Sequence, residues 1–335
     1  MKVAVIHTGA GNNSRKNEGQ YKRLFKRVLS QPNESIEDIL RVSEHLEKSE
    51  LTNTGYGSSL DINGEVFCDA GIIRVDQGQR DELSVHSIRH VFPIRETWKL
   101  MENLDLLYCE GLKFDKLGLS RPISLDYKLN DKILELLNKA KQEVNPDDLI
   151  LPRARYIYDY YMNRPEEVIE EIQDTIGIID INDTRKLVLT SSGGNFFKLP
   201  GRIGCAGTPR CAIDFKSNGK YTFSCMCSGN GEQIIRYGLS SLVIERMMQL
   251  EGDIDWSEAL QGIMESCKTE QGNIYVGVII VIEDMNDCQN NRLVYCHTTE
   301  TFQFGIKRMV DNQAEIEVIM SRLQKGSLVR GEYKL

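Results

Sequence analysis

Apolar residues recur along the chain with two periods, one typical of amphipathic helices and one typical of buried strands. Spacings of three and four residues predict helices over Glu18–Leu29, Ser35–Leu46, Pro93–Asn103, Asn130–Glu143, Glu232–Met248 and Ser257–Cys267. Apolar runs predict strands over Met1–Ile6, Thr175–Ile181, Leu187–Ser192, Tyr221–Cys227, Ile274–Glu283 and Leu293–Thr298. Strands accompanied by helices in both halves of the chain predict a layered α/β or α+β sandwich.

Short polar signals mark the ends of these elements. Ser35 followed by Asp38 predicts a capping box at the start of one helix. Asn63-Gly64 is a two-residue turn signal, so Leu60–Val75 is expected to form a hairpin. A glycine-rich turn is expected at His7–Gly11, although its spacing is not that of a nucleotide-binding motif.

The composition narrows the class of protein. The chain has 335 residues, of which 41% are hydrophobic and 27% are charged, as in an ordinary globular protein. This length predicts two domains or one large one. A net charge of −8 argues against a general binder of nucleic acids or membrane surfaces. No apolar run is long enough to cross a bilayer and no signal peptide is expected, so the expected location is cytoplasmic or nuclear.

The nine cysteines are expected to be free thiols in a reducing compartment, because their number is odd and no secretory signal is expected. Cys225 and Cys227 form the one close pair. Because no second pair stands at a metal-ligand spacing, we expect no zinc site and interpret this pair as one face of a buried strand.

Four segments rich in glycine and hydroxyl residues follow one another in the second half of the chain. They are Asp174–Gly177, Thr190–Gly194, Pro200–Gly204 and Ser228–Glu232. The last precedes a predicted helix, whose N-terminal N–H groups can bind an anion or a developing oxyanion. Each segment alone is more typical of a turn than of a site, so only their joint order indicates chemistry.

Together with three motifs of the first half, these segments resemble the type-2 (plant-type) asparaginase family of N-terminal nucleophile (Ntn) hydrolases. The first-half motifs are His7–Gly11, Thr52–Ser58 and Gly64–Ala70. Within the family, the chain is most similar to the threonine aspartase (taspase) branch. The resemblance covers residues 1–72 and about 170–250 well. It implies an α+β fold, the four-layer αββα sandwich of the Ntn hydrolases.

The resemblance implies that the chain cuts itself between Asp174 and Thr175. Thr175 would become the catalytic nucleophile, and its freed α-amine, with a pKa of roughly 7.7–8.0, would be the adjacent base that a hydroxyl nucleophile needs. Cleavage would give an α subunit of residues 1–174 and a β subunit of residues 175–335, which together form one domain. The acidic segment Asn163–Gln173 is interpreted as a loop that is released. Without the other motifs, Thr175 would be interpreted as an ordinary residue at the start of a strand.

Further site residues follow from their places in the family motifs. Ser192 matches the second hydroxyl, which orients the nucleophile. Ser228 and Gly229 match the oxyanion and substrate-contact positions, and Gly231 keeps the adjacent turn open. Alone, Ser192 would be interpreted as a turn hydroxyl.

Two further residues are expected to bind substrate. Arg202 matches the arginine that holds the substrate carboxylate through two parallel hydrogen bonds. Its alternative interpretation is a surface ion pair. Asn53 matches the family asparagine near the oxyanion site.

Cys205 is the main departure from the family pattern. Small-molecule asparaginases carry Asp in this place, where it binds the ammonium group of a free amino acid. A thiol does not replace it, so the preferred hypothesis is an endopeptidase that cuts after Asp in protein substrates. Two alternatives stay open: an L-asparaginase or isoaspartyl peptidase, and a catalytically inactive scaffold with this fold. Residues from about 77 to 165 also match the family poorly.

The family mechanism implies no cofactor and no catalytic metal, although some relatives bind sodium through backbone carbonyls. Family members pair as dimers of αβ units, so a homodimer is expected. Nucleic-acid and membrane partners are not expected.

Overall fold

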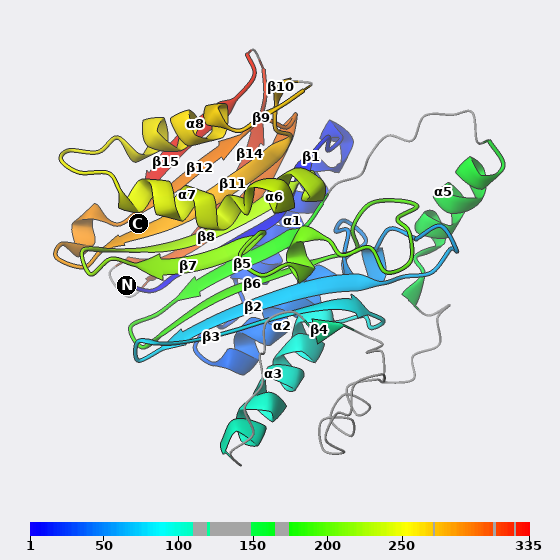
Figure 1. Ribbon diagram of the computed structural model, residues 1–335, viewed down its shortest axis with the longest axis horizontal. Helices are drawn as coiled ribbons and strands as arrows, with labels where there is room; N and C mark the ends of the chain where they lie inside the picture. Colours follow the sequence, from blue (N-terminus) through cyan, green and yellow to red (C-terminus); the bar gives the residue numbers. More distant parts are fainter. Residues whose placement is uncertain (110–118, 121–148, 165–173, 271, 311–312, 325) are drawn as a thin grey trace.

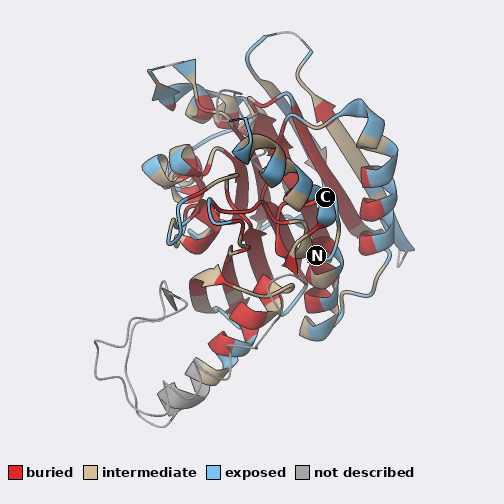
Figure 2. Ribbon diagram, turned by 90° about the vertical axis from the view of Figure 1, so that its right-hand side faces the viewer, coloured by how far each residue is buried: buried red, intermediate tan, exposed pale blue. Residues whose placement is uncertain are grey.

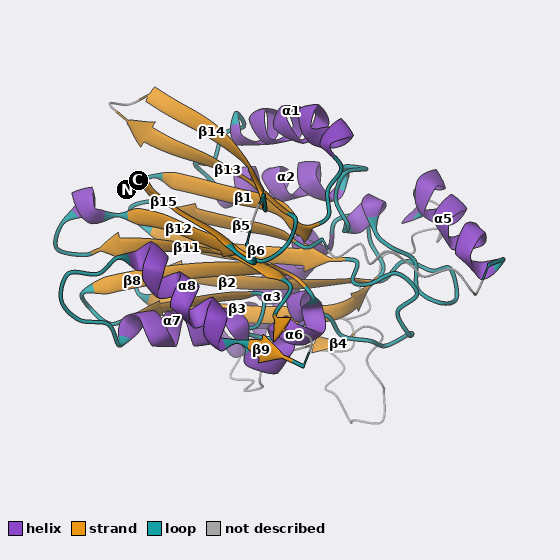
Figure 3. Cartoon of the chain, turned by 90° about the horizontal axis from the view of Figure 1, so that it is seen from above, coloured by secondary structure: helices purple, strands orange, loops and turns teal. Residues whose placement is uncertain are grey.

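Two stacked β-sheets form the centre of the molecule, and helices cover both outer faces (Figures 1 and 3). The computed structural model describes residues 1–335 except 110–118, 121–148, 165–173, 271, 311–312 and 325. Within these residues, the larger sheet has eight strands in the order β14-β13-β1-β5-β6-β2-β3-β4. Its strands are β1 (Val3–Gly11), β2 (Cys68–Asp76), β3 (Gln79–Ile88), β4 (Leu119–Ser120), β5 (Ile176–Ile181), β6 (Arg185–Ser192), β13 (Thr301–Val310) and β14 (Gln313–Arg322).

The smaller sheet faces one side of the larger one. Its five strands, again within the described residues, follow the order β15-β12-β11-β8-β7, and a separate two-stranded sheet pairs β9 with β10. The bounds are β7 (Ile213–Ser217), β8 (Tyr221–Gly229), β9 (Lys268–Thr269), β10 (Gly272–Asn273), β11 (Val276–Asp284), β12 (Arg292–His297) and β15 (Val329–Lys334).

The helices lie in two outer layers. They are α1 (Glu18–Leu29), α2 (Ile36–Glu47), α3 (Pro93–Cys109), α5 (Pro152–Met162), α6 (Gly231–Tyr237), α7 (Leu239–Met248) and α8 (Trp256–Ser266). Helices α1, α2 and α3 cover the larger sheet, α7 and α8 cover the smaller one, and α5 stands at one end (Figures 1 and 3). In the described part of the chain, no helix is long and apolar enough to cross a membrane.

Three hydrophobic cores hold the four layers together, and the strands carry most of the buried surface (Figure 2). One core joins α1, α2 and α3 to the larger sheet, and includes Phe25 and Leu46. A second lies between the facing sheets, with Val5 and Met226. The third joins α6, α7 and α8 to the smaller sheet, with Cys225 and Cys227. The predicted αββα sandwich is therefore confirmed, as is the interpretation of the two cysteines as one strand face.

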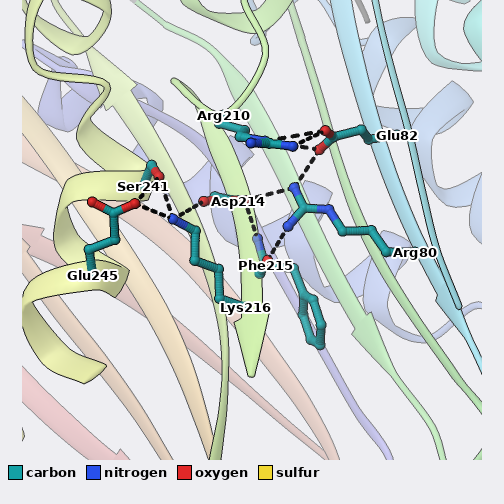
Figure 4. Close-up of polar contacts among 8 residues, drawn as sticks. All are labelled: Arg80, Glu82, Arg210, Asp214, Phe215, Lys216, Ser241 and Glu245. Carbon is teal, nitrogen blue, oxygen red and sulfur yellow. Dashed lines mark hydrogen bonds and ion pairs between the residues drawn. The ribbon is translucent and has the colours of Figure 1, made fainter. Parts of the chain in front are cut away.

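A network of charged side chains connects β3 of the larger sheet to β7 of the smaller one (Figure 4). Arg80 donates to the buried Asp214 carboxylate at 2.9 Å and also contacts Glu82 and the Phe215 carbonyl. Arg210 donates to the same Glu82. Because Arg80 belongs to β3 and Asp214 to β7, these bonds fix the smaller sheet against the larger one.

The hairpin predicted over Leu60–Val75 is wrong, because the hairpin forms one strand later in the chain. Asn63-Gly64 does form a turn, but the Asp61 side chain accepts hydrogen bonds from Asn63 N and Glu65 N, both at 2.9 Å, and closes it as a loop. The hairpin joins β2 to β3 instead. Its turn is Gln77-Gly78, where both residues have positive φ, 48° and 82°. That is the backbone of a type I′ turn, which matches strand twist.

Two other boundaries differ from the sequence prediction. His7–Gly11 is not a turn, because β1 continues through it with a β-bulge between His7 and Ala10. The predicted helix Glu232–Met248 is two helices, since Gly238 adopts a left-handed conformation with φ 54° and separates α6 from α7. The predicted helix over residues 130–143 and most of the acidic segment 163–173 lie outside the described residues.

Candidate active site

A small pocket opens where β5 begins, in the middle of the larger sheet. Residue Thr175 directly precedes β5 and is buried. Register places Ser191 opposite Ile176, so the end of β6 lies beside Thr175. The pocket brings together most of the predicted site residues; it is lined by Asn53, Asp174, Thr175, Ser192, Gly194, Asn195, Arg202, Gly204, Cys205, Gly229 and Gly231. Segments separated by more than a hundred residues thus meet in the predicted place.

Ser228 lies behind this pocket and holds the backbone of Thr175. Its Oγ accepts hydrogen bonds from Thr175 N at 3.2 Å and from Ala10 N at 3.0 Å. Ser228 is completely buried near the end of β8, in the smaller sheet. The hydroxyl therefore fixes the Thr175 nitrogen and the β1 bulge at the same time. The following residue, Gly229, has a φ of 126° and packs against the Tyr275 carbonyl, a place where no side chain fits.

Ser192 contacts the bond that is predicted to be cut. Its Oγ donates to the Asp174 carbonyl at 3.3 Å and accepts a hydrogen bond from Gly194 N at 3.0 Å. A donor at this carbonyl stabilises the negative charge that develops when a nucleophile attacks it. The Ser192 hydroxyl is therefore a donor to the carbonyl of the Asp174–Thr175 peptide bond.

Asn53 shapes the turn that follows Ser192. Its Nδ2 donates to the Gly194 carbonyl at 2.8 Å, and its backbone carbonyl accepts from Gly193 N at 2.7 Å. Its Oδ1 accepts from Ser59 N at 2.8 Å. The Asn53 side chain therefore lines the pocket as expected and also ties it to the loop before β2.

Arg202 is held in place by an acidic residue of the chain. Its Nε and Nη2 donate to Glu232 Oε1 at 3.0 Å and 2.6 Å. Partial burial tends to raise the pKa of Glu232, but the Arg202 guanidinium outweighs it and holds that pKa below its usual value. A Cβ at Gly194 or Gly204 would come within 2.7 Å of Arg202 Nη1. These two glycines therefore let the guanidinium lie close to the backbone of the pocket.

Cys205 supplies no charge to the pocket. Burial raises the pKa of its thiol to about 12, and a hydrogen bond with the Thr175 side chain opposes this only in part. The thiol is therefore neutral at physiological pH. It lies beside Thr175 in the pocket.

Two buried titratable groups flank the bond between Asp174 and Thr175. Burial lowers the pKa of His7 to about 3, and a contact with the Thr175 backbone opposes this weakly, so the imidazole is neutral. Burial also raises the pKa of the Asp174 carboxyl to about 7, against a hydrogen bond with Asn13. The imidazole beside the bond is therefore uncharged, whereas the Asp174 carboxyl titrates near neutral pH.

A larger cleft of about 710 Å³ adjoins the pocket, and Asn53 and Asp174 line both. Amide side chains make much of its wall: Asn12, Asn13, Asn17, Asn230 and Gln233. Clefts of this size accommodate ligands larger than a single amino acid. Among the described residues, no three His, Cys, Asp or Glu side chains come together as metal ligands.

Sequence reasoning missed two residues of this region. Glu232 was noted only as part of a motif, yet it is the ion-pair partner of Arg202. Lys198 was not singled out; it is 7% exposed and donates to the Gly193 carbonyl at 2.6 Å and to the Phe67 carbonyl. Its position in the mostly apolar stretch Phe196–Pro200 was the available signal, because a lysine in such a stretch is rarely buried without a specific partner.

Known proteins match the chain over most of its length. The family profile described as asparaginase matches residues 1–287. A plant-type L-asparaginase of Pyrobaculum calidifontis is 28% identical over 272 residues, 76% of this chain and 82% of that protein. An isoaspartyl peptidase/L-asparaginase of Xenopus laevis is 26% identical over 306 residues, 85% of this chain and 87% of that protein. A probable isoaspartyl peptidase/L-asparaginase of Drosophila melanogaster is 24% identical over 269 residues, 73% and 76% of the two chains. These names do not support the finer resemblance to the threonine aspartase branch.

Proposed function

We propose, since the chain belongs to the asparaginase family of hydrolases, that it is a self-activating amidohydrolase with Thr175 as its N-terminal nucleophile. The observation that carries this proposal is the geometry at the Asp174–Thr175 bond. There Ser192 Oγ donates to the carbonyl before the bond, and Ser228 Oγ holds the nitrogen after it. Both atoms of the amide are therefore engaged by hydroxyl groups.

Self-cleavage consumes one water molecule. The Thr175 Oγ attacks the Asp174 carbonyl carbon, the C–N bond breaks, and the nitrogen takes up a proton to become the free α-amine of Thr175. The ester that results joins Asp174 to the Thr175 oxygen. Water hydrolyses it, which leaves a carboxylate on Asp174 and restores the hydroxyl. The α-amine is then the base next to the nucleophile.

The processed site has the parts needed to hydrolyse an amide. Thr175 Oγ attacks the substrate carbonyl while its own amine takes the proton. Ser192 and the backbone near Gly229 are the donors for the developing oxyanion, and removal of one such donor typically costs about 10²–10³ in turnover. Arg202 takes the substrate carboxylate on the guanidinium edge that Glu232 leaves open.

The substrate supported best is an asparaginyl or isoaspartyl amide, because the named relatives are L-asparaginases and isoaspartyl peptidases. The endopeptidase that cuts after Asp is kept as a second candidate for one specific reason. Cys205 is neutral, so the pocket lacks the carboxylate that would bind a free ammonium group. A peptide segment has an uncharged amide in that place.

Intact-mass measurement tests self-activation. We expect the purified 335-residue chain to convert into fragments of residues 1–174 and 175–335. Thr175→Ala should stay at full length and lose turnover by about 10⁴-fold or more, as expected for removal of a nucleophile. A wild-type chain that stays uncut and inactive after long incubation would contradict this proposal and support the hypothesis of an inactive scaffold.

A substrate panel separates the two candidates. The processed protein is incubated with L-asparagine, with an isoaspartyl dipeptide and with a peptide that carries Asp in its interior. Release of ammonia or of the dipeptide's second residue supports the first candidate. Cleavage of the long peptide alone supports the second. Arg202→Ala should keep the fold and lose turnover on whichever substrate is used.

A further inference from the structure

The side chain of Lys198 lies directly beneath the turn that carries Ser192. Lys198 is 7% exposed, and its Nζ donates to the Gly193 carbonyl at 2.6 Å. The same Nζ donates to the Phe67 carbonyl, in the residue that precedes β2. One ammonium group thus joins the Ser192 turn, at the end of β6, to the start of the neighbouring strand β2.

This turn controls the direction of the Ser192 hydroxyl. Gly194 N donates to Ser192 Oγ at 3.0 Å, which leaves the Ser192 proton to reach the Asp174 carbonyl. Gly194 has a φ of 71°, and a Cβ there would be 3.3 Å from Lys198 Cδ. The aliphatic part of Lys198 therefore packs under Gly194, while its nitrogen holds the preceding carbonyl.

Asn53 holds the same turn from the other side, through Gly194 O and Gly193 N. The neutral amide of Asn53 and the buried cation of Lys198 thus both hydrogen-bond to this turn. Hydrogen bonds from a charged donor are roughly twice as strong as neutral ones. Burial of an ammonium group costs free energy unless several acceptors surround it. A side chain that only filled this space would therefore cost less free energy if it were apolar.

We propose that Lys198 is a positioning residue of the reaction, which fixes the Gly193–Gly194 turn so that the Ser192 hydroxyl points at the reacting carbonyl. The inference rests on the proposed function, because it assigns Lys198 a part in the same amide chemistry. Lys198 does not touch the substrate itself, since it does not line the pocket. It acts through Ser192 alone.

Lys198→Met tests this role, because Met keeps the apolar stem and removes the ammonium group. We expect self-cleavage to slow by about 10²-fold, which is the cost of a misplacement of about 1 Å at a reacting centre. The rate is measured by intact mass after cell-free synthesis of the chain. In processed protein, kcat should fall and KM should stay unchanged. Lys186→Met is the matched control, because Lys186 belongs to the same strand–turn unit but pairs with Glu283 away from the site. It should keep wild-type rates.

A double-mutant comparison separates positioning from a general structural role. In a Ser192→Ala background, Lys198→Met should slow self-cleavage by no more than about threefold, because the group that it positions is gone. Equal effects in both backgrounds, or a wild-type rate in Lys198→Met, would overturn the inference. A wild-type chain that neither cuts itself nor hydrolyses an amide would instead remove the proposed function.

Folding is checked separately, in the uncut Thr175→Ala background, by thermal unfolding. If Lys198→Met does not fold, Lys198→Gln replaces it; Gln is neutral and one bond shorter, but it keeps polar atoms for the buried carbonyls. A folded Lys198→Gln is expected to lose kcat with unchanged KM. A wild-type kcat in this variant would overturn the inference.

Discussion

The side chain at position 205 sets the charge of the pocket next to Thr175. Cys205 is buried against Thr175, and its thiol stays neutral because burial raises its pKa to about 12. The neighbouring Arg202 is balanced by Glu232 in the uncut chain. At position 205 the pocket therefore has no negative site beside Arg202 and Thr175.

Cys205→Asp should create that negative site. We expect kcat/KM for L-asparagine to rise by about 10–100-fold, since a hydrogen bond to a charged group contributes about 1.5–3 kcal/mol. Steady-state kinetics on asparagine and on an N-acetylated analogue, which lacks the ammonium group, measure the effect. Cys205→Ser is the control, because it is polar but neutral and should leave the ratio of the two substrates unchanged. An equal gain on both substrates would contradict this account.

Glu47 is a second buried group near the site, at the C-terminal end of α2. Its Oε1 accepts hydrogen bonds from Ser191 Oγ at 2.8 Å and from Ile94 N at 3.0 Å. Burial raises the pKa of the Glu47 carboxyl from 4.5 to about 8, and these two bonds reverse only part of the shift. The folded chain therefore holds a proton on Glu47 that the unfolded chain has lost.

Stability should consequently fall as pH rises through this range. Between pH 4.5 and about 8, the folded state binds the extra proton, so the contribution of Glu47 is complete below 4.5 and is lost as pH passes the folded pKa. The slope from this one group is at most about 1.4 kcal/mol per pH unit. Urea unfolding at several pH values compares the uncut Thr175→Ala chain with the same chain carrying Glu47→Gln. The Glu47→Gln substitution should remove this slope. A difference between the two chains that does not vary with pH would refute it.

Individual site residues could be predicted from the sequence when they stand in a motif of consecutive residues. Thr175, Ser192 and Arg202 lie in such motifs, and the structure brings them into one pocket. The neighbours Lys198 and Glu47 could not be recognised in this way. Their partners, the Phe67 carbonyl and Ser191 Oγ, are more than a hundred residues away in the chain. Only the fold brings them together.

At the scale of elements, prediction succeeded where local chemistry decides the structure. The helix predicted over Glu18–Leu29 has those bounds, and Ser35 and Asp38 form the predicted capping box. It failed where the conformation or the side chain of a single residue interrupts a pattern. Apolar periodicity continues across Gly238 without interruption, so the sequence pattern did not show that the left-handed residue divides the helix. The Asn63-Gly64 turn signal was real, but side-chain bonds to Asp61 made it a loop.

Gly238 gives a prediction about the boundary between α6 and α7. Gly238→Ala should lower the free energy of unfolding by about 1 kcal/mol, because alanine is strained at a φ of 54°. Gly262→Ala is the matched control: this glycine lies inside α8 with nothing within 4 Å of an added Cβ. It should stabilise the chain by about 0.5–1 kcal/mol. Urea unfolding of both variants measures the two signs, and a stabilised Gly238→Ala would show that the residue does not need its left-handed conformation.

At the scale of the whole molecule, the two segments on either side of Thr175 contribute unequally to the two sheets. The larger sheet interleaves them, since β1 pairs with β13 on one side and β5 on the other, and β2 pairs with β6. Every strand of the smaller sheet lies after residue 212. Among the described residues, the larger sheet is therefore built from both segments, whereas the smaller sheet is built from the second segment alone. Strand periodicity carries no information about such pairing.

This asymmetry predicts how the segments behave when they are made separately. A chain of residues 175–335 contains the complete core between the smaller sheet and α6, α7 and α8, but β5 and β13 lack their partner β1. Hydrogen exchange on this segment alone should show protected amides in β8, β11 and β12. The amides of β5 that face β1 should be unprotected, whereas β6 still pairs with the other edge of β5. Addition of residues 1–174 should restore protection on the β1-facing edge of β5 and give one species on gel filtration, because each edge of β1 is then paired again. Protection of that edge in the isolated segment would contradict this, since its free backbone groups would have found another partner.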